Sequence, residues 1–208
     1  MTIVRILFLI TLLWVSVFTS YAQDNWELKK NENGIAVYTR GIANEKLKEI
    51  RVVCELPGTT AKLISILQNV SGHPNWVYLS ERATLVKRLN HNSLVYYTIT
   101  DMPWPVTDRD LVVEFTYNHV PGTKNIAIRA ESTSGYVPPK KGFVRVPYSL
   151  ATWEVIPLTK DKIKVDYVFR VNPGGAIPAW LVNIAATTGP YNTFVKLREM
   201  LTDKQASK

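Results

Sequence analysis

The sequence predicts an α+β fold: a long, curved antiparallel sheet wrapped around one C-terminal α-helix, with a short helical insertion after the first strands. Three observations predict it. The chain has 208 residues, 46% of them hydrophobic, which suits one domain with a sizeable core. Apolar and polar residues alternate along most of it, as in half-buried strands. Two segments instead carry apolar residues at helical spacing.

The N-terminus is predicted to be a cleaved signal peptide covering residues 1–22. Arg5 precedes the apolar run 6–18, and Ser20-Tyr21-Ala22 offers small residues for cleavage. The run is shorter than the roughly 20 apolar residues that a spanning helix needs. We therefore expect a single domain of residues 23–208 that is secreted or periplasmic.

Period-two alternation marks the expected strands. They cover residues 34–40, 50–56, 82–90, 93–101, 111–117, 124–132, 143–157 and 162–171, with turn signals such as Pro121-Gly122 between them. Cys54 falls on the apolar side of its strand, so we expect a small core residue and not a reactive thiol. Because it is the only cysteine, an intramolecular disulfide framework is excluded.

Two segments are expected to be helices. Residues 59–70 follow Pro57-Gly58, begin with a capping hydroxyl at Thr59 or Thr60, and carry an apolar stripe. A closing amphipathic helix is expected to run from Pro178 toward Thr202. Gly189-Pro190 interrupts this helix, which predicts a kink or a split there.

A curved sheet crossed by a single helix need not be filled underneath. Strand alternation predicts bulky residues on the concave face, namely Tyr97, Phe115, Tyr117, Trp153, Tyr167 and Phe169. Periodicity alone slightly favours a fully packed core over a cavity, because aromatic stripes are more often core than ligand site.

Two segments resemble the START family of lipid-transfer domains. Residues 102–110, Met-Pro-Trp-Pro-Val-Thr-Asp-Arg-Asp, resemble the family's Trp-Pro loop and the Asp-Arg-Asp that opens the next strand. Residues 171–183 are similar to its Pro-Gly-Gly turn and the Pro-x-Trp-Leu-Val-Asn start of its C-terminal helix. Residues 33–40, Trp76 and residues 187–190 add further agreement. The resemblance spans about residues 25 to 202, nearly the whole expected domain.

The resemblance implies a helix-grip fold that encloses a tunnel for one apolar ligand, such as a lipid or sterol. It also implies that the Trp104 loop and the Trp180 end of the helix form the lid of this tunnel. The identity of the ligand does not carry over. With the concave-face aromatics added, the expected ligand-binding residues are Trp76, Tyr97, Trp104, Arg109, Phe115, Arg129, Trp153, Tyr167, Trp180 and Ile184.

Two of these residues have alternative interpretations. Arg109 shares parity with Leu111 and Phe115 and would then point inward, where its charge needs a carboxylate or an anionic ligand head group. The favoured alternative pairs Arg109 with Asp108 or Asp110 in a structural turn. Trp104 is either a membrane-inserting tip or a packed lid.

The expected function is binding and transfer of a hydrophobic ligand, without catalysis, a cofactor or a metal. The histidines His73, His91 and His119 lie in predicted loops and are expected at the surface, and Asp101 and Asp110 at strand ends are expected to be solvated. The alternatives are a cyclase- or hydrolase-like enzyme using the same tunnel, because helix-grip relatives include cyclases and aromatases, and a module that senses or buffers an apolar metabolite.

The charge pattern bears on the expected partners. The net charge of +8 is scattered and forms no basic run of the kind that binds nucleic acid. We expect a monomer that touches anionic membrane surfaces transiently and has no nucleic-acid partner.

Overall fold

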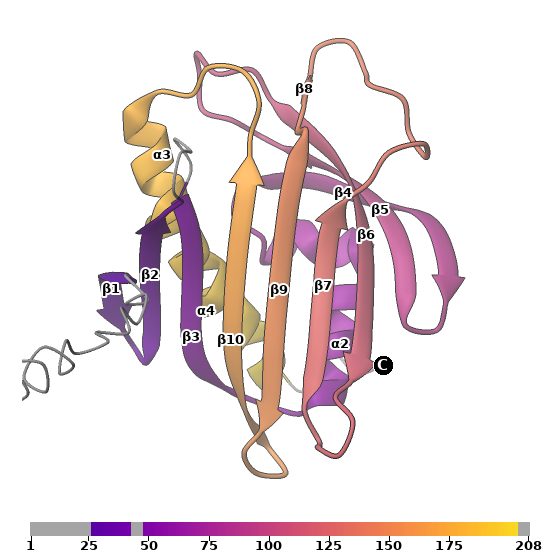
Figure 1. Cartoon of the computed structure of the whole chain (residues 1–208), viewed down its shortest axis with the longest axis vertical. Coiled ribbons are helices and arrows are strands. Elements are labelled where there is room, and N and C mark those ends of the chain that lie inside the picture. The colour runs from indigo at the N-terminus through magenta and orange to yellow at the C-terminus, as the bar shows by residue number, and fades with distance from the viewer. Residues whose placement is uncertain (1–25, 43–47, 204–208) are drawn as a thin grey trace, which may run out of the picture.

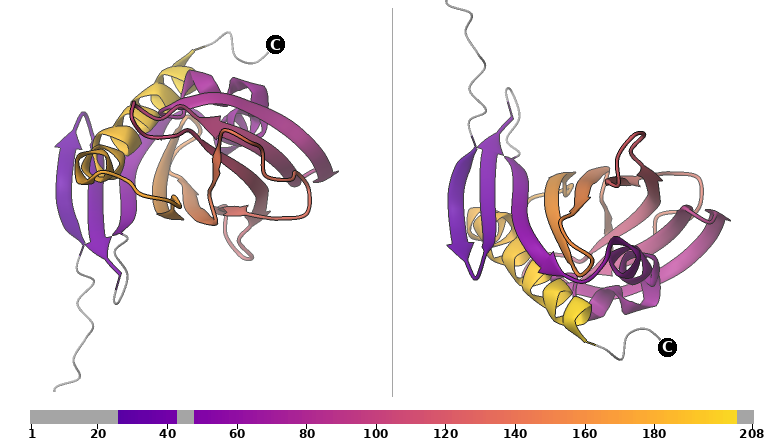
Figure 2. Two further views of the ribbon diagram at one scale, coloured as in Figure 1. Left: turned by 90° about the horizontal axis from the view of Figure 1, so that it is seen from above. Right: turned by 90° about the horizontal axis from the view of Figure 1, so that it is seen from below.

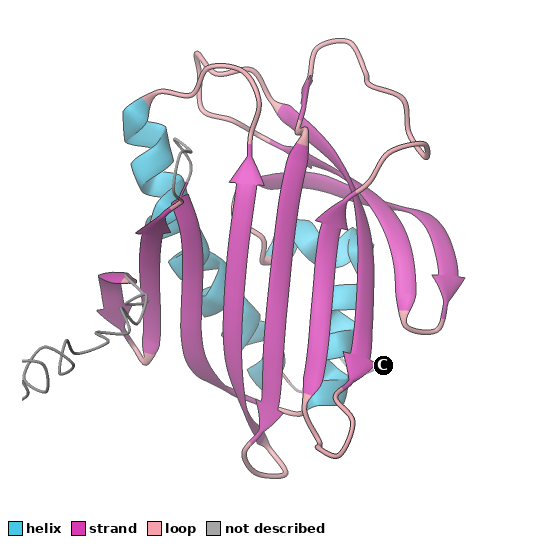
Figure 3. Ribbon diagram, viewed as in Figure 1, coloured by secondary structure: helices cyan, strands magenta, loops and turns pink. Residues whose placement is uncertain are grey.

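The structure, a computed structural model, describes residues 26–42 and 48–203, and the predicted signal peptide of residues 1–22 lies outside them. One continuous sheet dominates the fold, and the helices of the described residues lie on its concave face (Figure 1, Figure 3). The strand order is β1-β2-β3-β10-β9-β7-β6-β5-β4, and neighbours along this path are antiparallel. The short strand β8 pairs with β6 in parallel. The predicted α+β helix-grip architecture is confirmed.

Along the chain, one group of strands precedes a helical insertion and a second group follows it, and two further helices end the described part. The strands are β1 Glu27–Glu32, β2 Ile35–Gly41, β3 Lys48–Pro57, β4 Ser80–Asn90, β5 Ser93–Thr100, β6 Arg109–His119, β7 Ile126–Ser132, β8 Val144–Arg145, β9 Tyr148–Pro157 and β10 Lys162–Asn172. The helices are α2 Thr60–Gln68, the 3-10 helix η1 Val70–Asn75, α3 Ala179–Ala186 and α4 Thr188–Thr202.

The expected strands form where the alternation placed them, with two differences. Strand β1 was not predicted, because its side chains are mostly exposed and show no apolar alternation. The expected strand 143–157 is divided at Pro147, since proline has no N–H to donate to the ladder. Residues before the proline form β8 beside β6, and residues after it form β9 beside β7 and β10.

The helices begin and end at identifiable signals. Thr59 caps α2, where its Oγ1 accepts a hydrogen bond from the backbone N–H of Lys62 at 3.1 Å. The C-terminal helix is split, as one of the two expected outcomes, but the break lies at Thr187, just before Gly189-Pro190. Pro190 thus falls in the first turn of α4, where its missing N–H costs nothing.

The two halves of the C-terminal helical segment meet the sheet differently. Figure 2 shows α3 and α4 running diagonally across the concave face. The C-terminal part of α4 packs directly on the sheet, and Leu197 and Leu201 are buried with Val37 and Leu56 in the main core. Cys54 is buried in the same core, as expected, and burial raises the pKa of its thiol to about 12.

A second, smaller core lies on the convex face of the sheet. Val95, Tyr97, Ile99 and Val112 of β5 and β6 pack there beneath Val137 and Phe143 of the segment that precedes β8. Both faces of β5 are therefore buried. Within the described ranges, no helix is long and apolar enough to cross a membrane.

Candidate functional site

A cavity of about 350 Å³ lies between the concave face of the sheet and the helices η1, α3 and α4. Its wall combines the inward side chains of β4 to β7, β9 and β10 with the N-terminal half of α4, up to Phe194. The chain therefore keeps a hollow beside the N-terminal half of α4, whereas a fully packed interior was the outcome that periodicity alone favoured. The volume is within the range of small-molecule sites.

Aromatic rings form one side of this cavity. The ring centroid of Trp153 lies 4.7 Å from that of Tyr167 and 5.3 Å from that of Phe194. Tyr167 stacks on Phe169 at 6.1 Å along β10. Such contacts hold the rings in fixed orientations, so this side of the cavity is a preformed apolar surface.

The structure brings six of the expected ligand-binding residues together around the cavity. They are Trp76, Arg109, Phe115, Trp153, Tyr167 and Ile184. The other four, Tyr97, Trp104, Arg129 and Trp180, lie outside its wall.

Tyr97 points to the convex face, where it is buried in the second core. Its neighbour Tyr96 lines the cavity instead, together with Thr98 and Thr100 of the same strand. The strand carries aromatic residues at both parities here, so alternation alone did not distinguish them, and the prediction that Tyr97 faces the concave side is wrong. Tyr117, also expected on the concave face, is partly buried against the main core but is not part of the cavity wall.

The other three residues are exposed. Arg129 points away from the cavity and pairs with Glu131, with Nη2 to Oε2 at 2.7 Å. Trp104 is 90% exposed, so it is not a packed lid, and Trp180 is 47% exposed at the start of α3. Both tryptophans lie in segments at the end of the sheet where β6 begins and β10 ends (Figure 1).

Arg109 lines the cavity and is 4% exposed. The favoured expectation of an ion pair with Asp108 or Asp110 is wrong, because among the described residues Arg109 forms no ion pair within 4.0 Å. Its Nη1 donates to the carbonyl of Thr107, and its Nη2 donates to the carbonyls of Gly174 and Ala176 at 3.3 and 3.5 Å. Burial lowers the pKa of Arg109, and the charge of Asp108 partly opposes this.

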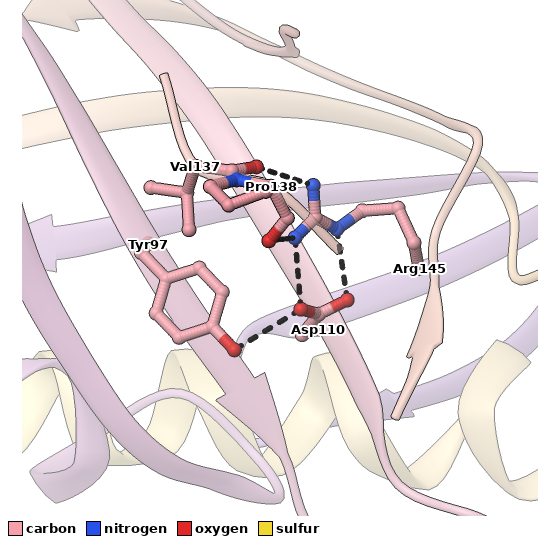
Figure 4. A network of polar contacts seen from close by, with 5 residues as sticks. All are labelled: Tyr97, Asp110, Val137, Pro138 and Arg145. Carbon is pink, nitrogen blue, oxygen red and sulfur yellow. Dashed lines mark hydrogen bonds and ion pairs between the residues drawn. The ribbon is translucent and has the colours of Figure 1, made fainter. Parts of the chain in front are cut away.

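Asp110 is buried on the convex side of β6, although it was expected to be solvated. Arg145 binds it through two hydrogen bonds of 2.8 and 2.9 Å, and the Tyr97 hydroxyl donates to it at 3.0 Å (Figure 4). Arg145 also donates to the carbonyls of Val137 and Pro138. This network, which the sequence did not reveal, holds the segment before β8 against the sheet.

His73 is buried in η1, although its loop position predicted a surface residue. Its Nε2 lies 2.9 Å from the carbonyl oxygen of Leu67, and its ring contacts Trp76 and Tyr96 edge-on. Burial lowers the pKa of His73, which favours the neutral imidazole. His91 and His119 are exposed, as expected.

The cavity wall is mainly apolar but contains isolated polar atoms. Trp76 Nε1, Ser80 Oγ and Arg109 Nε are buried without a hydrogen-bond partner in the described part of the chain. Burial also raises the pKa of Tyr96 and Tyr167, so both phenols stay neutral. Across residues 26–42 and 48–203, no group of three or more His, Cys, Asp or Glu side chains is placed to hold a metal. The arrangement suits enclosure of an apolar molecule that also offers a few polar groups.

Comparison with known proteins places this architecture in a family. The START domain model matches residues 19–207. An uncharacterized protein of Pseudomonas aeruginosa is 33% identical over 176 residues, which cover 84% of this chain and 86% of that protein. The mouse phosphatidylcholine transfer protein is 27% identical over 173 residues, 81% of this chain and 79% of its own length.

A solved structure agrees with the sequence matches. The crystal structure of a STAR-related lipid transfer protein from Xanthomonas axonopodis superimposes with a TM-score of 0.79 at 31% identity, covering 86% of this chain and all of that one. The fold, the cavity beneath the closing helix and the match over nearly the whole length have one explanation: the chain belongs to the START domain family of lipid-transfer proteins.

Proposed function

We propose that this protein binds a lipid or another apolar molecule in the cavity and carries it between membranes without changing it chemically. The observation that carries the proposal is the 350 Å³ hollow between the sheet and α3–α4, with its aromatic side. Removing apolar surface from water contributes about 25 cal/mol per Å², so enclosure supplies affinity without many polar contacts.

The relatives support this interpretation of the cavity. Two of the similar proteins are described as a phosphatidylcholine transfer protein and a STAR-related lipid transfer protein. The ligand of the present chain is not set by theirs, because the residues of a cavity wall determine which molecule fits. We also propose that the mature protein works outside the cytoplasm, as the sequence of residues 1–22 predicts.

The end of the molecule that carries Trp104 and Trp180 is the proposed membrane-facing end. Trp104 lies in the loop of residues 101–108, which joins β5 to β6, and Trp180 opens α3. An indole ring fits the interface between lipid head groups and acyl chains. The net charge of +8 favours an anionic surface. Movement of this loop and α3 would then open the cavity toward the bilayer.

A vesicle assay tests both parts of the proposal. The rate at which the purified protein transfers labelled lipid from donor to acceptor vesicles is measured. Native mass spectrometry then shows whether lipid is bound and chemically unchanged. Trp104→Ser should slow transfer several-fold while leaving bound lipid and thermal stability unchanged, because this side chain is exposed. Leu158→Ser, which alters an exposed apolar residue in the β9–β10 turn at the opposite end, is the matched control.

Faster transfer to anionic than to neutral vesicles is the expected result. Equal rates for Trp104→Ser and Leu158→Ser would contradict the proposed membrane-facing end. A protein that takes up no apolar compound from a lipid extract, or that converts it chemically, would contradict the carrier function itself.

A further inference from the structure

Three neighbouring strands place a row of polar side chains in the cavity wall. Ser80 at the start of β4 is opposite Thr100 at the end of β5, and Thr100 is opposite Arg109 at the start of β6. All three residues line the cavity. Directly opposed residues in antiparallel strands have Cβ atoms about 4.5–5.5 Å apart, so the three side chains are close enough to contact one chemical group.

Two members of this row are incompletely hydrogen-bonded. Ser80 Oγ and Arg109 Nε are buried and have no partner within the described ranges. The Nη2 contacts of Arg109 to Gly174 and Ala176, at 3.3 and 3.5 Å, are long for hydrogen bonds of a charged donor. A buried polar atom without a partner costs about 1–3 kcal/mol, and more if it is charged. The free protein therefore offers donors that a ligand can satisfy.

The charge of Arg109 is compensated only in part, by the charge of Asp108, which lies outside the cavity wall. No aspartate or glutamate is found among the described residues that line it. Asp110 lies on the opposite face of β6 and is bound by Arg145, and the Asp108 carboxylate accepts the backbone N–H of Met102 at 2.9 Å. A buried cation without an ionic partner is costly, so an anion at this position would be strongly favoured.

We propose that the ligand is an anionic amphiphile whose oxyanion, a carboxylate or a phosphate, is bound by Arg109, Ser80 and Thr100. Its hydrocarbon chain lies along the aromatic side formed by Trp153 and Tyr167. This inference rests on the proposed function, because it assigns the ligand class to the same cavity. The planar guanidinium, with Nε and Nη donors on one edge, matches the two oxygens of such a group.

Binding of single-chain probes with one common acyl chain tests the inference. The probes are oleate and oleoyl lysophosphatidic acid, which are anionic, and oleyl alcohol and monooleoylglycerol, which are neutral. Affinity is measured by displacement of a fluorescent fatty-acid analogue and checked by native mass spectrometry. We expect at least one anionic probe to bind about tenfold or more tightly than both neutral probes, the effect of one hydrogen bond to a charged group. The stronger anionic probe identifies the head group as a carboxylate or a phosphate.

Two variants separate a binding role from a structural one. Arg109→Gln should weaken the preferred anionic probe about tenfold or more and leave the neutral probes unchanged, whereas Arg129→Gln, which removes an exposed arginine outside the cavity, should change neither. Ser80→Ala removes only a hydroxyl that has no partner, so the fold is expected to tolerate it. Ser80→Ala should weaken the binding of the anionic probes and leave the binding of the neutral probes unchanged.

Equal affinity for anionic and neutral probes would overturn the inference and leave the carrier function intact. The same holds if Ser80→Ala and Arg109→Gln weaken all probes alike. Failure of every probe, and of a whole lipid extract, to bind would overturn the proposed function as well.

Discussion

The Asp110 carboxylate is 1% exposed and is held by Arg145 from β8 and by Tyr97 from β5. Burial alone would raise its pKa, but the hydrogen bonds from Arg145 and Tyr97 outweigh this and lower the pKa below its ordinary value. Arg145 also donates hydrogen bonds to the carbonyls of Val137 and Pro138. Arg145 thus holds the segment before β8 in place over the second core.

Removing Arg145 is expected to destabilise the protein strongly. Arg145→Met leaves the Asp110 charge buried without a cationic partner, which costs about 3 kcal/mol of unfolding free energy at pH 7. Urea unfolding measures this loss. Arg129→Met breaks the exposed pair with Glu131 and should cost less than about 1 kcal/mol. Equal losses of unfolding free energy in the two variants would show that the buried network stabilises the protein no more than an exposed ion pair does.

His73 is expected to make stability depend on pH. Burial lowers the pKa of its imidazole in the folded protein below the value of about 6.5 in the unfolded chain. As pH falls through 6.5, the unfolded chain takes up a proton that the folded protein does not. The stability that this difference provides is therefore complete above about pH 6.5 and decreases below it until the folded pKa is reached.

His73→Gln should flatten this dependence, as measured by the urea midpoint between pH 7 and pH 5. His91→Gln, at an exposed position in the β4–β5 turn, is the control and should keep the wild-type slope. Identical slopes for wild type and His73→Gln would rule out His73 as the source.

Residue positions were predictable where only one face of a strand is buried. Alternation correctly placed Phe115 on β6, Trp153 on β9 and Tyr167 on β10 toward the concave side. It failed on β5, because the segment before β8 covers the convex face there and both Tyr96 and Tyr97 find apolar surroundings. Contacts made by a distant loop leave no local pattern in the sequence.

At the scale of elements, the Pro-Gly-Gly turn between β10 and α3 connects the sheet to the helix and holds Arg109. Gly174 has a φ of +68°, and its carbonyl accepts from Arg109 Nη2. A Cβ atom at this position would lie 3.2 Å from Pro147 Cδ and 3.3 Å from Val144 Cγ1. The turn needs glycine for its backbone conformation and also for close packing.

Gly174→Ala should therefore reduce the free energy of unfolding by more than the penalty for a positive φ alone, because the added Cβ atom also crowds its neighbours. Gly122, which has a φ of +75° and open space within 4 Å of the position that a Cβ atom would take, provides the comparison. We expect Gly122→Ala to reduce the free energy of unfolding by the φ penalty of about 1–2 kcal/mol and Gly174→Ala to reduce it by more, so the melting temperature should fall further for Gly174→Ala. Equal shifts would mean that Pro147 and Val144 give way without cost.

Element boundaries followed local chemistry. Proline at position 147 ended β8, and the hydroxyl of Thr59 set the start of α2. The sequence predicted that the C-terminal helix is interrupted, but not at which residue. Pro190 is tolerated in the first turn of a helix, so the break lies before it, at Thr187. Strand β1 had no apolar alternation and was missed, since hydrogen bonding to β2 and not burial holds it in place.

At the scale of the whole molecule, the sequence predicted the α+β class and the helix-grip topology but left open whether the interior is packed or hollow. That outcome depends on the distance between α4 and the sheet. Leu197 and Leu201 at the C-terminal end of α4 are buried in the main core, whereas Pro190 and Thr193 nearer its N-terminus line the cavity. Single-residue periodicity contains no information about such a separation.

The most direct test of the central claim is quenching of tryptophan fluorescence by a brominated fatty acid. Trp153 lines the cavity, whereas Trp26 packs outside it, with the Arg40 guanidinium 4.5 Å from its ring. A ligand inside the hollow should quench saturably at one molecule per chain, and Trp153→Phe should remove more of the quenching than Trp26→Phe. Absence of saturable quenching, or equal losses in both variants, would contradict an apolar ligand beneath the closing helix.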